Sequence, residues 1–184
     1  MNIISKLTRH NNRGDSWPDK NFLEHLKEWD KTHPNQPTYG PIVRHTWQVD
    51  GQSYERLNPR NDGFYELPDA SGFLLCEKVD RPDNLLLLDV YGKERMRLSV
   101  PWQLTRQPTP ESAKYPSRFI GLTTSWNNPE TGEIGKFGVL AWVQYAGDYA
   151  FVLDWKTGQF KWGYFLERGY VMNTQTHCVI FNRS

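Results

Sequence analysis

The stretch FGVLAWVQYAGDYAFVLDWKTGQFKWGYF, residues 137–165, decides the fold. Three segments of it rich in apolar and aromatic residues, 137–145, 149–155 and 159–165, are separated by short turn sequences, as successive strands are. The two connections between these segments have three residues each and contain glycine, which suits tight turns between antiparallel strands. The stretch therefore predicts a three-stranded antiparallel meander.

Two hairpins are predicted upstream of the meander. Residues 42–49 alternate between apolar and polar, and Asp50-Gly51 then supplies the positive φ angles of a tight turn before a return strand at 53–57. The run of leucines at 85–88 does not alternate, which predicts a strand buried on both faces. A turn at Gly92-Lys93 would lead it into a second strand. Shorter strands are expected at 64–67, 73–79 and 178–181.

These strands follow one another through short connections, so the fold class is mainly β, an antiparallel sandwich or open barrel. The exception is one amphipathic helix at about 20–32, where Phe22, Leu23, Leu26 and Trp29 recur at helical spacing. A length of 184 residues favours a single domain, with an N-terminal segment at 1–37 and the β domain at 38–184.

Charge and hydropathy exclude several classes of partner. With 22 Lys and Arg against 21 Asp and Glu, the net charge of +1 offers no field to hold nucleic acid or an anionic membrane. No stretch approaches the roughly 20 apolar residues that span a bilayer, and residues 1–7 are too short for a signal-peptide core. We therefore expect a soluble, cytoplasmic protein. Cys76 and Cys178 lie in apolar segments, typical of buried thiols, and a disulfide between them stays open.

The segment from Asp154 to Trp162 has the pattern Asp-x-x-Thr-Gly-x-x-x-Trp. It resembles the repeat turn of quinoprotein-type β-propellers, in which the carboxylate binds turn N–H groups and the glycine takes the left-handed conformation. A propeller needs at least about four blades of this kind. Residues 129–132 repeat only the turn itself. The motif therefore predicts a stable hairpin and no quinone cofactor.

Signatures of catalysis and of metal binding are missing from the sequence. It contains no Gly-x-Ser-x-Gly elbow, no phosphate-binding glycine loop and no His-Glu-x-x-His zinc motif. His25 and His33 lie eight residues apart, out of phase on a helix. Glu130 and Glu133 could form an acid–base pair but flank a turn, where solvated carboxylates are usual. We expect no enzyme, metal or cofactor, although residues could still converge in three dimensions.

Aromatic residues concentrate between 142 and 164. Strict alternation places Tyr149, Phe151, Leu153 and Trp155 on one face of their strand, and Phe160, Trp162 and Tyr164 on one face of the next. That face is either an aromatic core or a binding platform, because clusters of exposed Trp and Tyr mark protein interfaces and sugar-stacking surfaces.

Three functions are consistent with these features. The size and the lack of a visible catalytic site resemble the small cytoplasmic immunity proteins that block a cognate toxin, which implies a protein partner and steric inhibition. The alternatives are a glycan- or small-ligand-binding β domain and an enzyme with a hidden site. The polar loops at 101–116 and 125–135 are the expected functional regions. The candidate partner-binding residues are Trp126, Asn127, Asn128, Glu130, Glu133, Asp148, Tyr149 and Trp155.

Overall fold

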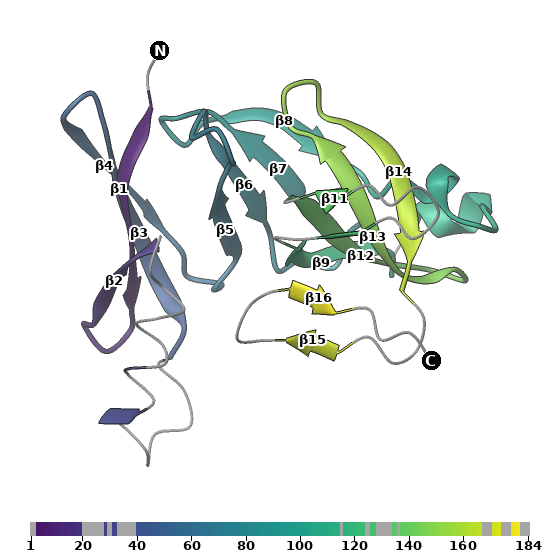
Figure 1. The fold of residues 1–184 in the computed structure, drawn as a ribbon, viewed down its shortest axis with the longest axis horizontal. Coiled ribbons are helices and arrows are strands. Elements are labelled where there is room, and N and C mark those ends of the chain that lie inside the picture. Colours follow the sequence, from purple (N-terminus) through teal and green to yellow (C-terminus); the bar gives the residue numbers. More distant parts are fainter. Residues whose placement is uncertain are drawn as a thin grey trace. The chain divides into compact units, whose positions relative to one another are not determined.

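The computed structural model describes residues 3–19, 28, 31–32, 40–114, 116–123, 126–127, 134–135, 137–166, 171–173 and 178–180. Within these ranges the chain is mainly β (Figure 1). Three sheets have four strands each, in the orders β2-β1-β3-β4, β5-β6-β7-β8 and β14-β13-β12-β9. The smaller pairs are β10-β11 and β15-β16. The predicted antiparallel β class is confirmed, as several open sheets without a closed barrel among the described strands.

The strands are β1 (Ile4–Asn11), β2 (Ser16–Pro18), β3 (Ile42–Val49), β4 (Gln52–Leu57), β5 (Gly63–Glu66), β6 (Phe73–Cys76), β7 (Leu85–Leu88), β8 (Glu94–Leu98), β9 (Arg118–Thr123), β10 (Trp126–Asn127), β11 (Ile134–Gly135), β12 (Gly138–Val143), β13 (Gly147–Asp154), β14 (Gln159–Phe165), β15 (Val171–Asn173) and β16 (Cys178–Ile180). Their contacts define two compact units. The first comprises residues 1–75 with 88–95, and the second comprises 76–87 with 96–184.

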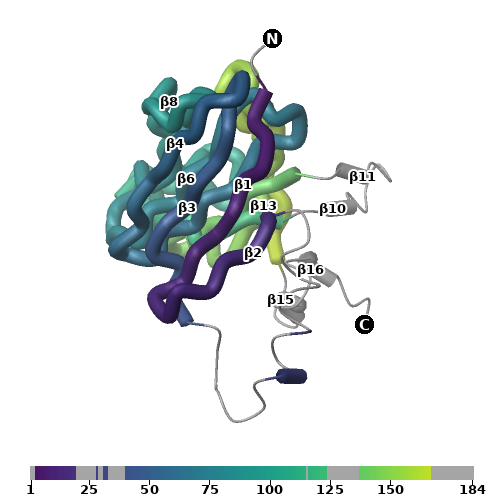
Figure 2. Tube along the Cα trace, turned by 90° about the vertical axis from the view of Figure 1, so that its left-hand side faces the viewer, coloured from purple at the N-terminus to yellow at the C-terminus, as the bar shows by residue number. Residues whose placement is uncertain are grey.

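The first sheet is built on the predicted β3–β4 hairpin. Asp50 and Gly51 have φ angles of 51° and 80°, the two positive values of a type I′ turn, which confirms the prediction at this point. On the other side of β3 lies β1, which in turn pairs with β2 (Figure 2). The sequence pattern did not predict β1 or β2, because residues 4–11 and 16–18 are mostly polar.

A β-bulge interrupts β1 where it pairs with β3. Ser5 lies opposite Gln48 and Thr8 opposite Thr46, so β1 holds one more residue than its partner over this interval. Lys6 takes up the extra residue with a φ of 53°, a left-handed conformation that a lysine rarely adopts. Because of the bulge, Leu7 stays buried while Lys6 is exposed.

Aromatic rings form the core of the first unit. Trp47 of β3 packs against Phe73 with ring centroids 4.8 Å apart, and Phe73 stacks on Phe64 at 4.5 Å. The indole N–H of Trp47 donates to the backbone oxygen of Val90 at 2.7 Å. A buried indole N–H needs a hydrogen-bond acceptor, and the Val90 carbonyl group supplies it here.

The four leucines of β7 are buried, as expected for a strand covered on both faces. The turn that follows β7 lies earlier than predicted. The N–H of Gly92 donates to the backbone oxygen of Asp89, and the Asp89 carboxylate accepts from the N–H groups of Tyr91 and Lys93. The predicted two-residue turn at Gly92-Lys93 is therefore wrong. The aspartate caps a three-residue connection that ends on Gly92 in the left-handed region, with φ 78°.

The second unit contains the predicted meander, β12, β13 and β14, and adds β9 beside β12. Tyr149, Phe151 and Leu153 of β13 are buried, so their side of the sheet is a core. Phe160 joins that core, 5.7 Å from Phe119 and 5.9 Å from Phe151 between ring centroids. This outcome favours the aromatic-core interpretation for these residues.

The prediction that Phe160, Trp162 and Tyr164 share one face is wrong. Phe160 lies opposite Leu153 whereas Trp162 lies opposite Val152, so the register shifts between them by one residue. Lys161 is the additional residue, and a bulge of this kind reverses the alternation beyond it. Tyr164 consequently packs with Leu140, Ala150 and Leu166 on the other side of the sheet.

The predicted helix at 20–32 lies almost wholly outside the described residues. Only Glu28, Lys31 and Thr32 are described within it, with helical backbone, and no complete α-helix is assigned in the described part of the chain. No helix among the described residues is both long and apolar enough to cross a membrane. Cys76 is buried, as expected, whereas the side chain of Cys178 falls outside the description.

Candidate interaction surfaces

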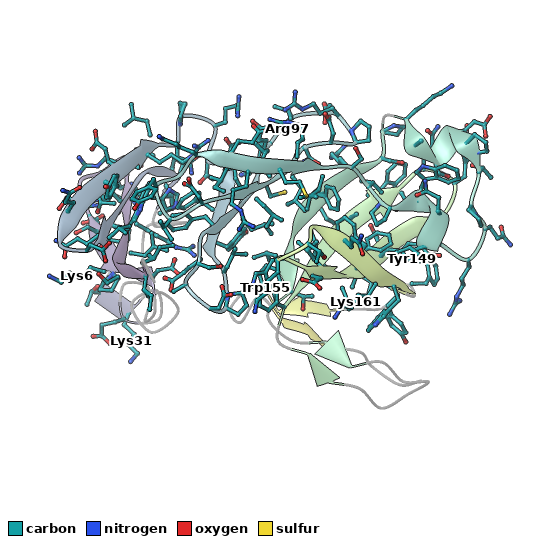
Figure 3. The ribbon with its side chains drawn as sticks, turned by 90° about the horizontal axis from the view of Figure 1, so that it is seen from above. Lys6, Lys31, Arg97, Tyr149, Trp155 and Lys161 are labelled. Atoms are coloured by element: carbon teal, nitrogen blue, oxygen red, sulfur yellow. The ribbon has the colours of Figure 1, made fainter. Side chains whose placement is uncertain are left out.

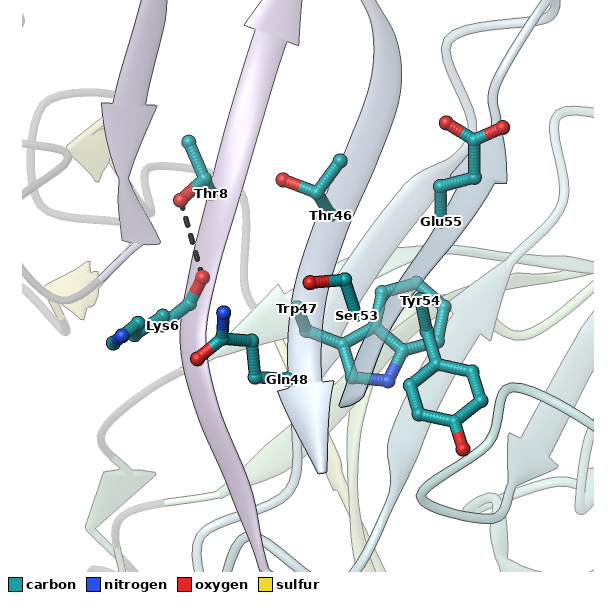
Figure 4. Close-up of a pocket in the computed structure, with 8 residues that line it drawn as sticks. All are labelled: Lys6, Thr8, Thr46, Trp47, Gln48, Ser53, Tyr54 and Glu55. Atoms are coloured by element: carbon teal, nitrogen blue, oxygen red, sulfur yellow. Dashed lines mark hydrogen bonds between the residues drawn. The ribbon is translucent and has the colours of Figure 1, made fainter. Parts of the chain in front are cut away.

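A polar groove lies on the solvent side of the first sheet (Figure 4). Its volume is about 510 Å³, within the range of roughly 300–1,000 Å³ that is usual for ligand sites. Alternation along β1, β3 and β4 sends polar side chains to this side of the sheet. The groove is lined by Lys6, Thr8, Thr46, Trp47, Gln48, Ser53, Tyr54 and Glu55.

Hydrogen bonds order one wall of the groove. The Thr8 hydroxyl donates to the backbone oxygen of Lys6 at 3.1 Å, across the bulge. Thr46 Oγ1 lies 2.9 Å from His10 Nε2. On the opposite wall, the Glu55 carboxylate lies 3.7 Å from an Arg44 nitrogen and its side chain is 61% exposed. A surface pair of this kind contributes little stability, so Glu55 can exchange its partner at low cost.

An exposed tyrosine marks the second unit. Tyr145, in the turn between β12 and β13, is 73% exposed and has a φ of 64°. A bulky side chain in the left-handed region is uncommon and strained, and such strain clusters at binding and catalytic sites. Tyrosine is also among the residue types that dominate binding energy at protein interfaces.

The predicted loop at 101–116, together with Ser117 just after it, holds this turn in place. It forms two short 3-10 helices, Trp102–Leu104 and Pro110–Ala113. The hydroxyl of Ser112 donates to the backbone oxygen of Gln144 at 2.7 Å, and the hydroxyl of Ser117 accepts from the Gln144 N–H at 2.8 Å. Both serines are fully buried. The Tyr145 turn therefore rests on a rigid base, and the loop acts as a support.

The structure describes the side chains of Asp148, Tyr149 and Trp155 among the eight residues predicted from the sequence. Asp148 is half-buried and lies three residues beyond Tyr145, at the start of β13. Tyr149 is only 2% exposed, and its hydroxyl accepts from the Arg106 N–H at 3.0 Å. Tyr149 is therefore a core residue, whereas the sequence analysis expected it to contact a partner. Asn128, Glu130 and Glu133 lie outside the described residues, as do the side chains of Trp126 and Asn127.

Trp155 is half-buried on the second unit (Figure 3). Its ring meets Phe137 edge to face with centroids 5.3 Å apart. The indole N–H is buried and has no hydrogen-bond partner among the described residues. Packing accounts for the ring but leaves the N–H unexplained. Asp154, just before it, accepts from the N–H groups of Lys156 and Thr157, as the turn motif predicted.

One buried histidine is electrostatically unusual. Burial in the core, with the nearby charges of Arg9, Arg56 and His10, lowers the pKa of His45 to about 3. Its ring packs against Phe64, and Nδ1 has no hydrogen-bond partner in the part of the chain that the structure describes. At neutral pH His45 is uncharged. Among the described residues no group of three or more His, Cys, Asp or Glu is placed to hold a metal ion.

Comparison with known proteins gives a likeness of fold. No protein-family model matches the sequence, and no curated protein matches it. Among solved structures, this chain is similar to a chain in one described as "Structure of Tne2 in complex with Tni2". The TM-score is 0.62 at 12% sequence identity, over 90% of this chain and 100% of the other. The β architecture is thus one that also occurs in a chain from a two-protein complex.

Proposed function

We propose that this chain is a non-enzymatic protein-binding module of the immunity type. It would bind a toxin in the cytoplasm and cover the toxin's active site sterically. The observation that carries the proposal is Tyr145, a strained and exposed aromatic side chain on a turn that two buried serines anchor. A rigid aromatic side chain loses little entropy when it becomes buried in a partner.

Two further observations support a protein partner. Asp148 lies at the start of β13, three residues beyond Tyr145, and an acidic group near an aromatic anchor can select a basic patch on a partner by electrostatic complementarity. The fold is similar to that of a chain solved within a complex of two proteins. Under this proposal the partner meets Tyr145 at the centre of the interface and Asp148 towards its rim.

Affinity capture tests the proposal. The tagged full-length chain is used as bait in native lysate, the stoichiometric partner is identified by mass spectrometry, and co-expression is tested for rescue of growth from that partner's toxicity. We expect Tyr145→Ala to weaken the complex at least about 30-fold, as loss of an interface hot spot does. The matched control is Tyr91→Ala, since Tyr91 is an exposed tyrosine in a different turn. Recovery of no stoichiometric partner, or unchanged affinity in Tyr145→Ala, contradicts the proposal.

The groove favours a second candidate function, binding of a glycan or another hydroxylated small molecule. Its Thr, Ser, Gln and Glu side chains can donate to and accept from hydroxyl groups. Trp47 lines the groove but is only 2% exposed, which leaves Tyr54 as the half-buried aromatic there. Calorimetric titration with a sugar panel tests this function, and Gln48→Ala should abolish any heat of binding that arises in the groove.

A further inference from the structure

Strand β4 is an edge strand of the first sheet. Its partner β3 lies on one side, and no described strand pairs with the other side. The two-residue turn at Asp50-Gly51 makes Val49 and Gln52 a hydrogen-bonded pair. Alternation from that pair sends the backbone groups of Tyr54 and Arg56 towards β3.

The backbone groups of Ser53, Glu55 and Leu57 therefore point outward from the sheet. An independent bond confirms this phase, because the N–H of Asn58 donates to the backbone oxygen of Val43 at 2.6 Å, the next pair in the same series. The side chains of these three residues are exposed on the groove side of the sheet, and Leu57 is 69% exposed.

Natural proteins protect such edges with prolines, bulges, charged side chains or very short strands. Strand β4 has six residues, no proline and an unbroken register with β3. It does carry charges at Glu55 and Arg56, and these select what can pair with it. Three outward N–H groups with their carbonyls make a template for strand addition.

A second copy of this chain is a poor match for the edge. Antiparallel pairing places outward-facing residues opposite one another. The register that uses most of β4 then sets Glu55 directly against Glu55 of the second copy. Like charges at opposed positions are destabilising. The edge suits a different sequence, with a basic residue at the position facing Glu55.

We propose that β4 accepts an extended segment of another protein as an antiparallel fifth strand. That segment carries a lysine or arginine opposite Glu55, an apolar residue opposite Leu57 and an acidic residue opposite Arg56. Its groove-side residues lie along the wall that Ser53 and Glu55 form. The inference rests on the proposed function only in that the occupant is a protein, since it uses a surface different from the Tyr145 turn.

Peptide titration followed by NMR tests the inference on the full-length chain. The probe is the capped peptide Val-Glu-Lys-Tyr-Thr, which places its lysine opposite Glu55. The control is Val-Lys-Glu-Tyr-Thr, which has the same composition with its two charges exchanged. We expect the probe to shift the amides of Ser53, Glu55 and Leu57 and to slow their hydrogen exchange at least about fivefold. The control should bind several-fold more weakly. Equal effects of both peptides, or no change at these amides, overturn the proposal.

A pair of variants isolates the backbone contribution. Glu55→Pro removes an outward N–H and no bond to β3, whereas Glu55→Gln keeps the N–H and removes only the charge. Probe binding should be lost in Glu55→Pro and reduced in Glu55→Gln. If Glu55→Pro does not fold, Ser53→Pro replaces it. Retained binding in a folded proline variant overturns the proposal.

Sedimentation of the free chain and partner capture complete the test. If the free chain is a dimer and Glu55→Pro makes it monomeric, β4 pairs with a second copy. This result overturns the proposal that β4 pairs with another protein. A captured partner that depends on Tyr145 but leaves the β4 amides unprotected overturns this inference and supports the proposed function. Probe binding at β4 without any captured toxin supports this inference while contradicting the proposed function.

Discussion

The indole N–H of Trp47 and the backbone oxygen of Val90 form a buried hydrogen bond of 2.7 Å. Trp47→Phe removes the donor and one of the two fused rings, which leaves the carbonyl group unsatisfied and a small cavity in the core. We expect a loss of about 1–3 kcal/mol in the free energy of unfolding, measured by urea denaturation. Tyr54→Phe is the control, since its hydroxyl bonds only an exposed Gln52, and it should cost less than about 0.5 kcal/mol. Equal losses of unfolding free energy in the two variants would contradict a stabilising role for the Trp47–Val90 hydrogen bond.

His45 predicts a specific dependence of stability on pH. Its folded-state pKa of about 3 lies below the ordinary value of 6.5. Above pH 6.5 the histidine is neutral in both states and has no effect. As the pH falls from 6.5 towards 3, the unfolded chain takes up a proton that the folded chain does not, so stability is lost by about 1.4 kcal/mol per pH unit. His45→Leu removes this contribution. The difference in unfolding free energy between variant and unmodified protein, followed from pH 7 to 5, should change by about 2 kcal/mol. Parallel curves would contradict the prediction.

Ser117 is expected to stabilise both the fold and the Tyr145 turn. Ser117→Ala removes the hydroxyl that accepts from the Gln144 N–H, at a cost of about 1–3 kcal/mol by thermal or chemical unfolding. Because this bond anchors the turn, amide hydrogen exchange at residues 144–147 should accelerate more than exchange in β13. An unchanged exchange rate in the turn would show that the serine does not support it.

Tyr145→Gly should raise stability and reduce binding. The glycine adopts a φ of 64° without strain, so we expect the free energy of unfolding to rise by about 0.5–1 kcal/mol. The same variant removes the exposed ring and should weaken partner capture as Tyr145→Ala does. A destabilised Tyr145→Gly would mean that contacts of the ring outweigh the strain of its backbone.

Gly158 tests the structural interpretation of the Asp-x-x-Thr-Gly turn. It has a φ of 74°, and a Cβ there would lie 2.0 Å from Met96 Sδ. Gly158→Ala should therefore cost about 1–3 kcal/mol, of which the left-handed backbone accounts for about 1–2. Gly121→Ala is the matched control in the same unit, because nothing lies within 4 Å of its added Cβ. The motif is not needed for the hairpin if the two variants unfold alike.

Local patterns in the sequence were sufficient for the β3–β4 hairpin and for strand β7, but not for the turn that follows β7. Asp50-Gly51 requires positive φ at both positions, and the alternation of 42–49 follows from one buried face, so both can be recognised from neighbouring residues alone. The leucines of β7 were equally informative because they are apolar without interruption. The exposed Tyr145 and the groove were not predicted. A turn tyrosine gives no sequence signal, and the groove residues come from three separate strands.

The sequence by itself determined that this protein is an antiparallel β structure whose aromatic residues concentrate in the meander, since strand patterns and turn chemistry act between neighbouring residues. Only the tertiary structure decided which faces the side chains take. The bulges at Lys6 and Lys161 each insert one residue, and each reverses the alternation beyond it. The partner strand fixes the register, so a bulge cannot be recognised from one strand alone. The register with β13 therefore places Trp162 and Tyr164 on the opposite face from Phe160. Pairing with β3 likewise makes the mostly polar residues of β1 a strand.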